Sequence, residues 1–484
     1  MLVDALQYLW ANASYNRPKK QLCAVLMIFL IQTMIAACRS DPIVRPPSCV
    51  APKDWFPKTP PPTNAQPDPN SDCDFYKWAW QSFLSVTQGD SPGNAKPRFL
   101  EFQVPFELFV SRVGKRVEKT TKVDLPVNPD SVIQAGSQGL LVDQNGRAIY
   151  YQTHLNSVFV RFVRDGGYTE STKLRSAPAS LEFPKGSLEL KSSWKIVAPG
   201  EDASKFFTTA AIIPLLGLRN GQVFIDPAKT REETVALLGL HVVGVVQGHP
   251  EFIWATFEHN DNAPDLPPDL DPRGQEPVNS QRNWILYPKG TRARDCNKKP
   301  GESPLSPLKF ADEDRQVLQP KVAVFRQFPF GGDDEPDLIK GLNDSVHRQL
   351  PADLTVWRNY SLMGAVWLNT PDRDFIENAD FTTIDASDPG MKVLGGDKKL
   401  SNTTMETFTQ STQNCFSCHN TMARPMSQVD GFPAKKLNVS HVLTNAYAHA
   451  TQSRKQVTLL RSATKLRADH LNSQNTHLLE RRLP

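Results

Sequence analysis

The residues with the most specific chemistry lie near the C-terminus, where Cys415, Cys418 and His419 form a C-x-x-C-H motif. This spacing is the pattern of c-type haem attachment. The two thiols would add across the vinyl groups of one haem, and the adjacent imidazole would bind its iron as the proximal ligand. The motif therefore predicts one covalent haem c bound through Cys415, Cys418 and His419.

Other uses of a C-x-x-C pair fit this chain less well. A thioredoxin-like pair needs a surrounding βαβ pattern, a zinc site needs a second pair of ligands, and the sequence contains neither. With 7 Cys and 10 His in 484 residues, the expected number of chance C-x-x-C-H matches is on the order of 0.002. We therefore interpret the C-x-x-C-H motif as a haem-attachment site.

The ligand on the other side of the iron is left open by the sequence. Met422 is only three residues from His419 and can hardly reach the opposite face of the haem. A thioether ligand would raise the reduction potential relative to two imidazoles, and an open position would allow reactions with peroxide, oxygen or nitric oxide. The candidate distal ligands are Met405 and Met426, then His441, and farther along the chain His249 or His259.

The N-terminal segment has the layout of an export signal. An uncharged apolar run over residues 22–37 follows three basic residues, Arg17, Lys19 and Lys20. The run ends at Cys38 and resembles a bacterial lipoprotein signal, which implies that residues 1–37 are a signal peptide and that Cys38 carries lipid. A transmembrane anchor, or an ordinary signal peptide with Cys38 incidental, is the alternative. Arg39 in place of aspartate weakly favours the outer membrane.

A proline-rich segment follows. Ten of the 40 prolines fall in residues 41–72, a composition typical of an extended, semi-rigid spacer. We therefore assign residues 38–72 to the lipidated cysteine and a tether. Of the three cysteines left over, Cys49, Cys73 and Cys296, at most one pair can form a disulfide, and the sequence does not say which.

Residues 73–390 are expected to form an antiparallel β-rich domain. Residues 187–197 alternate apolar and polar side chains, and residues 234–246 and 252–257 are more continuous apolar runs. Residues 140–151 predict a hairpin around an Asn-Gly turn. A short amphipathic helix over residues 75–84 would precede these strands.

Residues 391–484 are expected to form a small α-helical, cytochrome c-like haem region, which makes the fold class α+β. A short helix over residues 402–410 would lead into the motif. A second helix over about residues 439–479 would carry a basic face, usually a solvated one, that could also dock an acidic redox partner or anionic lipid. The basic residues of that face are Arg454, Lys455, Arg461, Lys465 and Arg467.

Charge and motif content exclude several classes. With 55 basic and 51 acidic residues, the net charge of +4 is too balanced to indicate a nucleic-acid-binding protein. The sequence also lacks GxGxxG after a strand, GxxxxGK[ST], HExxH and GxSxG patterns. The acidic residues of the loop at 260–305 do not match an EF-hand and indicate a solvated turn.

A family resemblance rests on several segments together. Residues 400–407 leading to 414–419, with residues 79–84, 186–191 and 254–259, are similar to segments of exported bacterial proteins described only as cytochrome c family. The resemblance covers about residues 74–445. It implies a single haem and a periplasmic setting, and it carries over Cys415, Cys418 and His419.

Together these features predict a monohaem c-type cytochrome in the bacterial cell envelope, lipid-anchored and facing the periplasm. The predicted function is one-electron transfer with a redox partner protein. The alternative is a haem-dependent oxidoreductase or a haem-based sensor with an open sixth iron position, so the sequence leaves open whether the protein is an enzyme.

Overall fold

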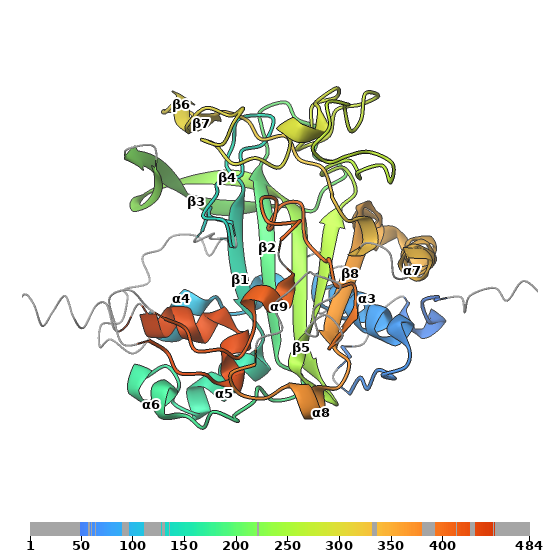
Figure 1. Ribbon diagram of the computed structural model, residues 1–484, viewed down its shortest axis with the longest axis vertical. Coiled ribbons are helices and arrows are strands. Elements are labelled where there is room, and N and C mark those ends of the chain that lie inside the picture. The colour runs from blue at the N-terminus through green and yellow to red at the C-terminus, as the bar shows by residue number, and fades with distance from the viewer. Residues whose placement is uncertain are drawn as a thin grey trace, which may run out of the picture. The chain divides into compact units, whose positions relative to one another are not determined.

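An antiparallel β-sheet of seven strands lies at the centre of the part of the chain that the structure describes (Figure 1). The strand order is β1-β2-β4-β5-β8-β9, and β3 pairs with the first part of β4. The strands of this sheet are β1 (Tyr150–Leu155), β2 (Leu188–Ile196), β3 (Thr208–Arg219), β4 (Gln222–Val246), β5 (His249–His259), β8 (Tyr360–Leu368) and β9 (Leu394–Gly396). A separate hairpin contains β6 (Lys309–Asp312) and β7 (Val317–Gln319).

The structure is a computed structural model, and the described residues belong to a compact unit that begins at Cys49. It describes residues 49–450 apart from 57–58, 60, 63, 90–95, 111–126, 128–130, 135, 220–221, 332–335, 380–392, 413, 426–430 and 449. Cys38, Met426, the predicted signal peptide and the basic residues 454–467 lie outside the described residues.

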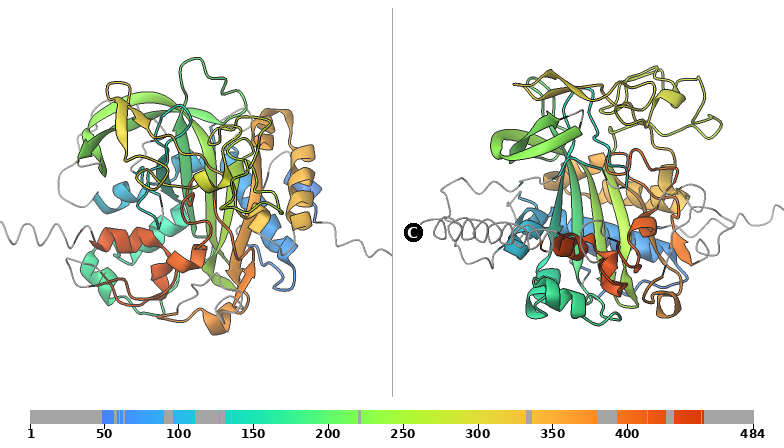
Figure 2. Two further views of the ribbon diagram at one scale, coloured as in Figure 1. Left: turned by 45° about the horizontal axis from the view of Figure 1, so that its top comes forward. Right: turned by 60° about the vertical axis from the view of Figure 1, so that its left-hand side comes forward.

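Short helices surround the sheet (Figure 2). The α-helices are α3 (Asp72–Thr87), α4 (Pro105–Val110), α5 (Ser157–Asp165), α6 (Ser171–Ser176), α7 (Pro336–Gln349), α8 (Pro371–Asp374) and α9 (Cys415–Cys418). The 3₁₀ turns are η1 (Lys53–Trp55), η2 (Arg98–Glu101), η3 (Ala293–Asp295), η4 (Pro329–Gly331), η5 (Ala352–Asn359) and η7 (Lys436–Val439). The antiparallel sheet and these helices together confirm the α+β class.

The central strands form where the sequence predicts them. β2 occupies nearly all of the predicted segment 187–197, and β4 and β5 contain the two apolar runs. The predicted turn is present at Asp143–Gly146, where Val142 bridges to Ala148. Gly146 has a φ of +77°, and a Cβ there would approach Val317 to 2.8 Å, so glycine is required.

The two faces of the sheet are buried against different parts of the chain. Side chains alternate along a strand, so Leu240 and Val242 of β4 enter the core shared with α3, whereas Val243 and Val245 enter a second core. The second core contains side chains from α5, from α9 and from residues 432–447. The C-x-x-C-H segment therefore packs on the face of the sheet opposite α3.

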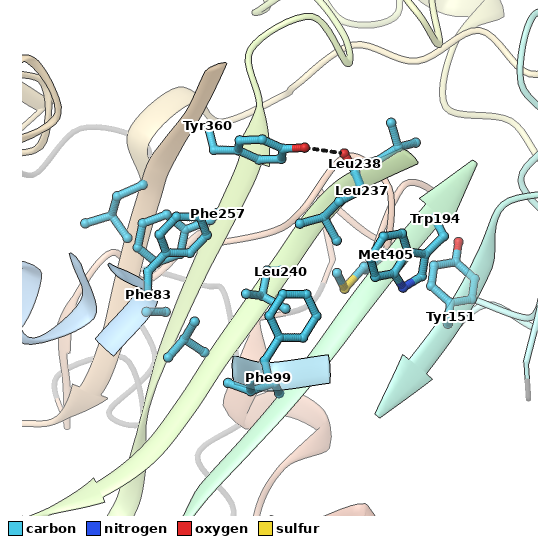
Figure 3. Close-up of a cluster of buried hydrophobic side chains, with 14 of the residues drawn as sticks. Phe83, Phe99, Tyr151, Trp194, Leu237, Leu238, Leu240, Phe257, Tyr360 and Met405 are labelled. Atoms are coloured by element: carbon cyan, nitrogen blue, oxygen red, sulfur yellow. Dashed lines mark hydrogen bonds between the residues drawn. The ribbon is translucent and has the colours of Figure 1, made fainter. Parts of the chain in front are cut away.

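The first core is rich in aromatic side chains (Figure 3). Phe83 of α3 stacks on Phe257 of β5 with ring centroids 4.2 Å apart. Trp80 of the same helix donates its indole N–H to Asn343 of α7 over 2.7 Å. The predicted helix over 75–84 is thus confirmed, and it is longer and more buried than an amphipathic surface helix.

The predicted helix over residues 402–410 is wrong. These residues form successive turns. The Asn402 side-chain oxygen accepts from the backbone N–H of Thr404 over 2.9 Å, and Thr407 donates its hydroxyl to the Thr403 carbonyl. Such side-chain bonds to the backbone compete with a helix. Farther on, residues 441–448 are helical, which is the described beginning of the predicted C-terminal helix.

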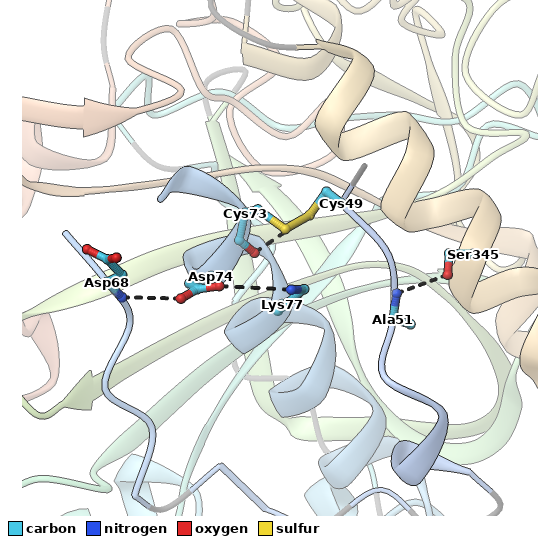
Figure 4. The surroundings of a disulfide bond; sticks show 7 residues. All are labelled: Cys49, Ala51, Asp68, Cys73, Asp74, Lys77 and Ser345. Carbon is cyan, nitrogen blue, oxygen red and sulfur yellow. Dashed lines mark hydrogen bonds and ion pairs between the residues drawn. A yellow bond between two sulfur atoms is a disulfide. The ribbon is translucent and has the colours of Figure 1, made fainter. Parts of the chain in front are cut away.

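Part of the segment predicted to be a tether packs on the folded unit (Figure 4). Cys49 and Cys73 form a disulfide, and Cys296 is a buried free cysteine. Ala51 donates its backbone N–H to Ser345 of α7 over 2.9 Å, and Trp55 is buried. Within the described residues, no helix is long and apolar enough to cross a membrane.

The disulfide closes a loop with a sequence separation of 24 residues. Replacing Cys49 and Cys73 with alanine should lower the free energy of unfolding by about 3 kcal/mol, because the unfolded chain gains the entropy of the open loop. Denaturant unfolding of the double variant measures this loss. Cys296→Ala is the control for loss of a buried cysteine, and an equal loss in both proteins would contradict the role of the crosslink.

Candidate haem-attachment site

A pocket lies where the C-x-x-C-H segment meets the sheet. Its cavity volume is about 90 Å³, within a hollow of about 780 Å³ that includes open solvent. One wall is formed by side chains of β2, β4 and β5, and the other by residues 400–419. Cys415, Cys418 and His419 all line this pocket, so the three motif residues share one cavity.

The motif is held by a capped single helical turn. The Asn414 side-chain oxygen accepts from the backbone N–H of Ser417, and the Ser417 hydroxyl accepts from that of Asn414, both over 3.0 Å. This reciprocal arrangement is a capping box. Phe416 is fully buried in the second core, near Trp254. Burial of Phe416 fixes which way the turn faces and leaves Cys415 and Cys418 on the pocket side.

His419 is oriented by its surroundings. Its Nδ1 bonds to the carbonyl of Val439 over 2.8 Å, which makes Nδ1 the protonated nitrogen and leaves Nε2 for a ligand. Its ring lies 4.1 Å from the Trp254 ring and 4.1 Å from the His441 ring, centroid to centroid. Burial, and next the neighbouring His441, hold the pKa of His419 well below its usual value. A neutral imidazole is the form that binds a metal.

Cys415 and Cys418 form no disulfide in this structure. Burial is the main cause that raises the pKa of the Cys415 thiol and of the Cys418 thiol above their usual value. Cysteines of thiol–disulfide enzymes have lowered pKa values instead. The environment of this pair therefore does not favour thiolate catalysis.

Three residues that line the pocket have a buried polar atom without a hydrogen-bond partner among the described residues. The atoms are Nε1 of Trp254, Nδ2 of Asn414 and Oγ of Ser401, and each has almost no accessible surface. The apolar side chains of Val243 and Leu400, with Trp254, line the pocket and suit the macrocycle of a haem. The residues present thus fit the group that the motif implies.

Ionisable side chains also line the pocket. Glu189 accepts a hydrogen bond from the Ser440 hydroxyl over 2.7 Å, and burial raises its pKa to about 7. Burial alone would raise the pKa of Glu406, but His241, with Lys191 and the Asn402 backbone N–H, outweighs burial and lowers it. The pocket therefore combines an apolar surface with the side chains of Glu189, Lys191, His241, Glu406 and His419.

The predicted distal ligands are not gathered in the pocket. Met405 is fully buried in the first core, near Trp194 and Leu237 (Figure 3). His441 stacks on His419 and bonds through Nε2 to the Cys418 carbonyl over 2.9 Å, so it lies beside the histidine of the motif. Met426 lies outside the described residues.

The two histidines predicted from the β-rich region have structural partners. His249 bonds to Glu251 over 3.0 Å. His259 stacks on Phe206 with centroids 3.9 Å apart, and burial lowers its pKa to about 4. Neither histidine is among the residues that line the pocket.

His241 of β4 is a pocket residue that the sequence analysis missed. It lines the cavity and bonds through Nε2 to Oε1 of Glu406 over 3.1 Å. A signal for it does exist, because His241 is a polar residue inside the otherwise apolar run 234–246. Which cavity it faces depends on the pairing of β4 with β2 and β5, which the sequence alone does not supply.

A buried ion pair holds the loop that forms the second wall. Glu258 of β5 accepts from the backbone N–H of Thr403 over 2.8 Å and also bonds to its hydroxyl. Arg326 binds the same carboxylate over 2.8 Å and pairs with Asp265. The loop that supplies Leu400, Ser401 and Glu406 to the pocket is thereby tied to β5.

Comparison with known proteins identifies no relative: no family model, no curated protein and no solved structure matches this chain. Within the described residues, no cluster of three or more His, Cys, Asp or Glu side chains has the arrangement of a metal-ion site.

Arg326→Met should destabilise the protein by about 3–5 kcal/mol, because it leaves the carboxylate of Glu258 buried without its partner. Thermal or denaturant unfolding measures the loss. The matched control is Arg273→Met, which removes a cation whose side chain is 90% exposed and should cost no more than about 0.5 kcal/mol. Equal stabilities of the two variants would contradict a role for Arg326 in holding the loop.

Proposed function

We propose that this protein is a monohaem c-type cytochrome that transfers single electrons to or from a redox partner protein. One observation carries the proposal: Cys415, Cys418 and His419 line a single pocket, in which the Nδ1 bond to Val439 leaves Nε2 of His419 for the iron. The apolar side chains of Val243 and Leu400 in the same pocket add support, because they suit the macrocycle of a haem.

The residues have distinct tasks in this proposal. Cys415 and Cys418 hold the haem by thioether bonds, and His419 holds its iron. Trp254 packs on the imidazole, with ring centroids 4.1 Å apart. The haem, when bound, supplies the one-electron couple. The protein positions the haem, partly excludes water from it and supplies the charges around it.

A second candidate function is a haem-dependent oxidoreductase or a haem-based sensor. The observation in its favour is the set of ionisable side chains that line the pocket, since such groups can bind or protonate a small ligand: Glu189, Lys191, His241 and Glu406. This candidate requires an open coordination position on the iron.

The cell envelope is the proposed location, with a lipid anchor at Cys38 and the folded unit on the periplasmic side. The disulfide between Cys49 and Cys73 supports an oxidising compartment. Haem c is also attached outside the bacterial cytoplasm, which agrees with an export signal. The outer membrane remains the weakly favoured membrane because Arg39 follows the cysteine.

The full chain, produced in a bacterium with an active haem c maturation system, should carry one covalent haem. A denaturing gel stained for haem and a reduced-minus-oxidised spectrum with a haem c α-band measure this. Replacing both Cys415 and Cys418 with alanine should abolish the stain. Cys296→Ala, which removes a buried cysteine elsewhere, should keep it. A stain that survives loss of both motif cysteines would sink the attachment site.

Cys38→Ser should abolish incorporation of labelled palmitate and release the protein from the membrane fraction, because the thiol that accepts the lipid is gone. Cys23→Ser, inside the predicted signal peptide, should leave the label unchanged. Labelling that persists in Cys38→Ser would favour an ordinary signal peptide or a transmembrane anchor.

A further inference from the structure

We infer that His241, held by Glu406, is the second axial ligand of the haem iron. The inference deepens the proposed function and rests on it, because it needs a haem attached at Cys415 and Cys418. The observation behind it is a second imidazole, that of His241, in the pocket lined by Cys415, Cys418 and His419. His241 belongs to β4 and not to the motif.

The strand register places His241 near the proximal histidine. In the pairing of β4 with β5, Val243 lies opposite Trp254, and His241 lies opposite Thr256. All four residues line the pocket. His241 is therefore a diagonal neighbour of Trp254, and diagonal pairs on one sheet face lie about 7–8 Å apart. The Trp254 ring is the surface against which His419 packs.

The two imidazoles come from different segments of the chain. His419 follows α9 and is positioned by Val439, whereas His241 projects from β4. An iron held by two imidazoles needs a second histidine from a segment other than the motif. His241 is a described pocket residue that meets this need with a ring nitrogen.

Glu406 gives His241 the second partner that metal-bound histidines have. Its Oε1 bonds to Nε2 of His241 over 3.1 Å, and its Oε2 accepts from the backbone N–H of Asn402 over 2.9 Å. Histidine ligands commonly donate one ring N–H to a carboxylate, which fixes the ring and leaves the other nitrogen for the metal. The backbone N–H of Asn402 holds the Glu406 carboxylate in place, and this carboxylate in turn fixes the orientation of the His241 ring.

The competing side chains are engaged elsewhere. His441 stacks on the ring of His419 and is bonded to the Cys418 carbonyl, which puts it on the proximal side. Met405 is enclosed in the first core. Lys191 faces the pocket opposite His241, but a lysine ammonium has no lone pair to donate.

Ligation by His241 would set the spin state, the reduction potential and the reactivity of the iron. Two imidazoles fill both axial positions, give a low-spin iron and set a lower potential than a histidine–methionine pair. A filled sixth position slows the binding of carbon monoxide and cyanide. The inference therefore favours the electron carrier over an enzyme or sensor with an open iron.

The test uses the full chain with its covalent haem. Wild-type protein should show a low-spin ferric spectrum by absorption and electron paramagnetic resonance. His241→Ala should become high-spin and should bind carbon monoxide faster by on the order of tenfold or more, because the position is open. Added imidazole should restore the low-spin spectrum. Haem staining and far-ultraviolet circular dichroism of every variant report haem attachment and folding separately from ligation.

Three matched variants complete the design. His441→Ala should stay low-spin, since His441 lies beside His419. His241→Met should stay low-spin with a raised midpoint potential, which keeps the test decisive if the alanine variant folds poorly. Glu406→Gln should keep the low-spin spectrum but shift the midpoint potential, because the carboxylate tunes the imidazole.

Two results would overturn the inference while leaving the proposed function standing. One is a stained, haem-loaded wild-type protein that is high-spin. The other is a His241→Ala protein that remains low-spin with unchanged carbon monoxide binding, above all if His441→Ala then becomes high-spin. A wild-type protein without covalent haem would overturn the proposed function, and the inference with it.

Discussion

The alternation of side chains along β4 and β5 is the constraint on which the rest of the structure depends. Each strand gives one set of side chains to the core under α3 and the other set to the pocket and second core. Leu240 and Val242 are buried on one side, while His241 and Val243 between and after them line the cavity. A slip of one residue would exchange the two sets. The packing of α3 therefore fixes which residues face the motif.

The buried polar contacts follow from the same constraint. Glu258 has no exposed surface, so its carboxylate must be satisfied inside the protein. Arg326 neutralises it, and Thr403 bonds to it from the loop that precedes the motif. Because one carboxylate serves both, the loop cannot leave β5 without removing two hydrogen bonds from a buried, charged group. The pocket wall and the sheet are in this way stabilised together.

Much of this architecture could be predicted from local sequence patterns. Strands can be identified from the order of apolar and polar residues. Alternation, as in residues 187–197, indicates a strand with one buried face, and the apolar runs of β4 and β5 indicate strands with two buried faces. The C-x-x-C-H spacing is equally local. The helix expected over 402–410 fails for a partly local reason: Asn402 and Thr407 use their side chains to bond to the nearby backbone, while Thr403 bonds to the distant Glu258.

What could not be predicted depends on pairing between distant segments. The disulfide between Cys49 and Cys73, with Cys296 left free, is decided by which segments the fold brings together. The same holds for His241, whose chemistry appears only when the register of β4 with β5 and the position of Glu406 are known. Met405 and His441 are close to the motif in sequence, but one is enclosed in the first core and the other stacks beside His419.

The motif itself is too small to build a haem site alone. α9 is a single turn of four residues, and its orientation depends on Phe416 in the second core and on the Val439 carbonyl, which reaches His419 from a later segment. In the proposed cytochrome, the sheet therefore does what a helical bundle does in small haem proteins: it supplies a rigid wall against which the proximal histidine packs. Because the other face of the same sheet packs on the first core, haem binding and the folding of the sheet depend on the same strands.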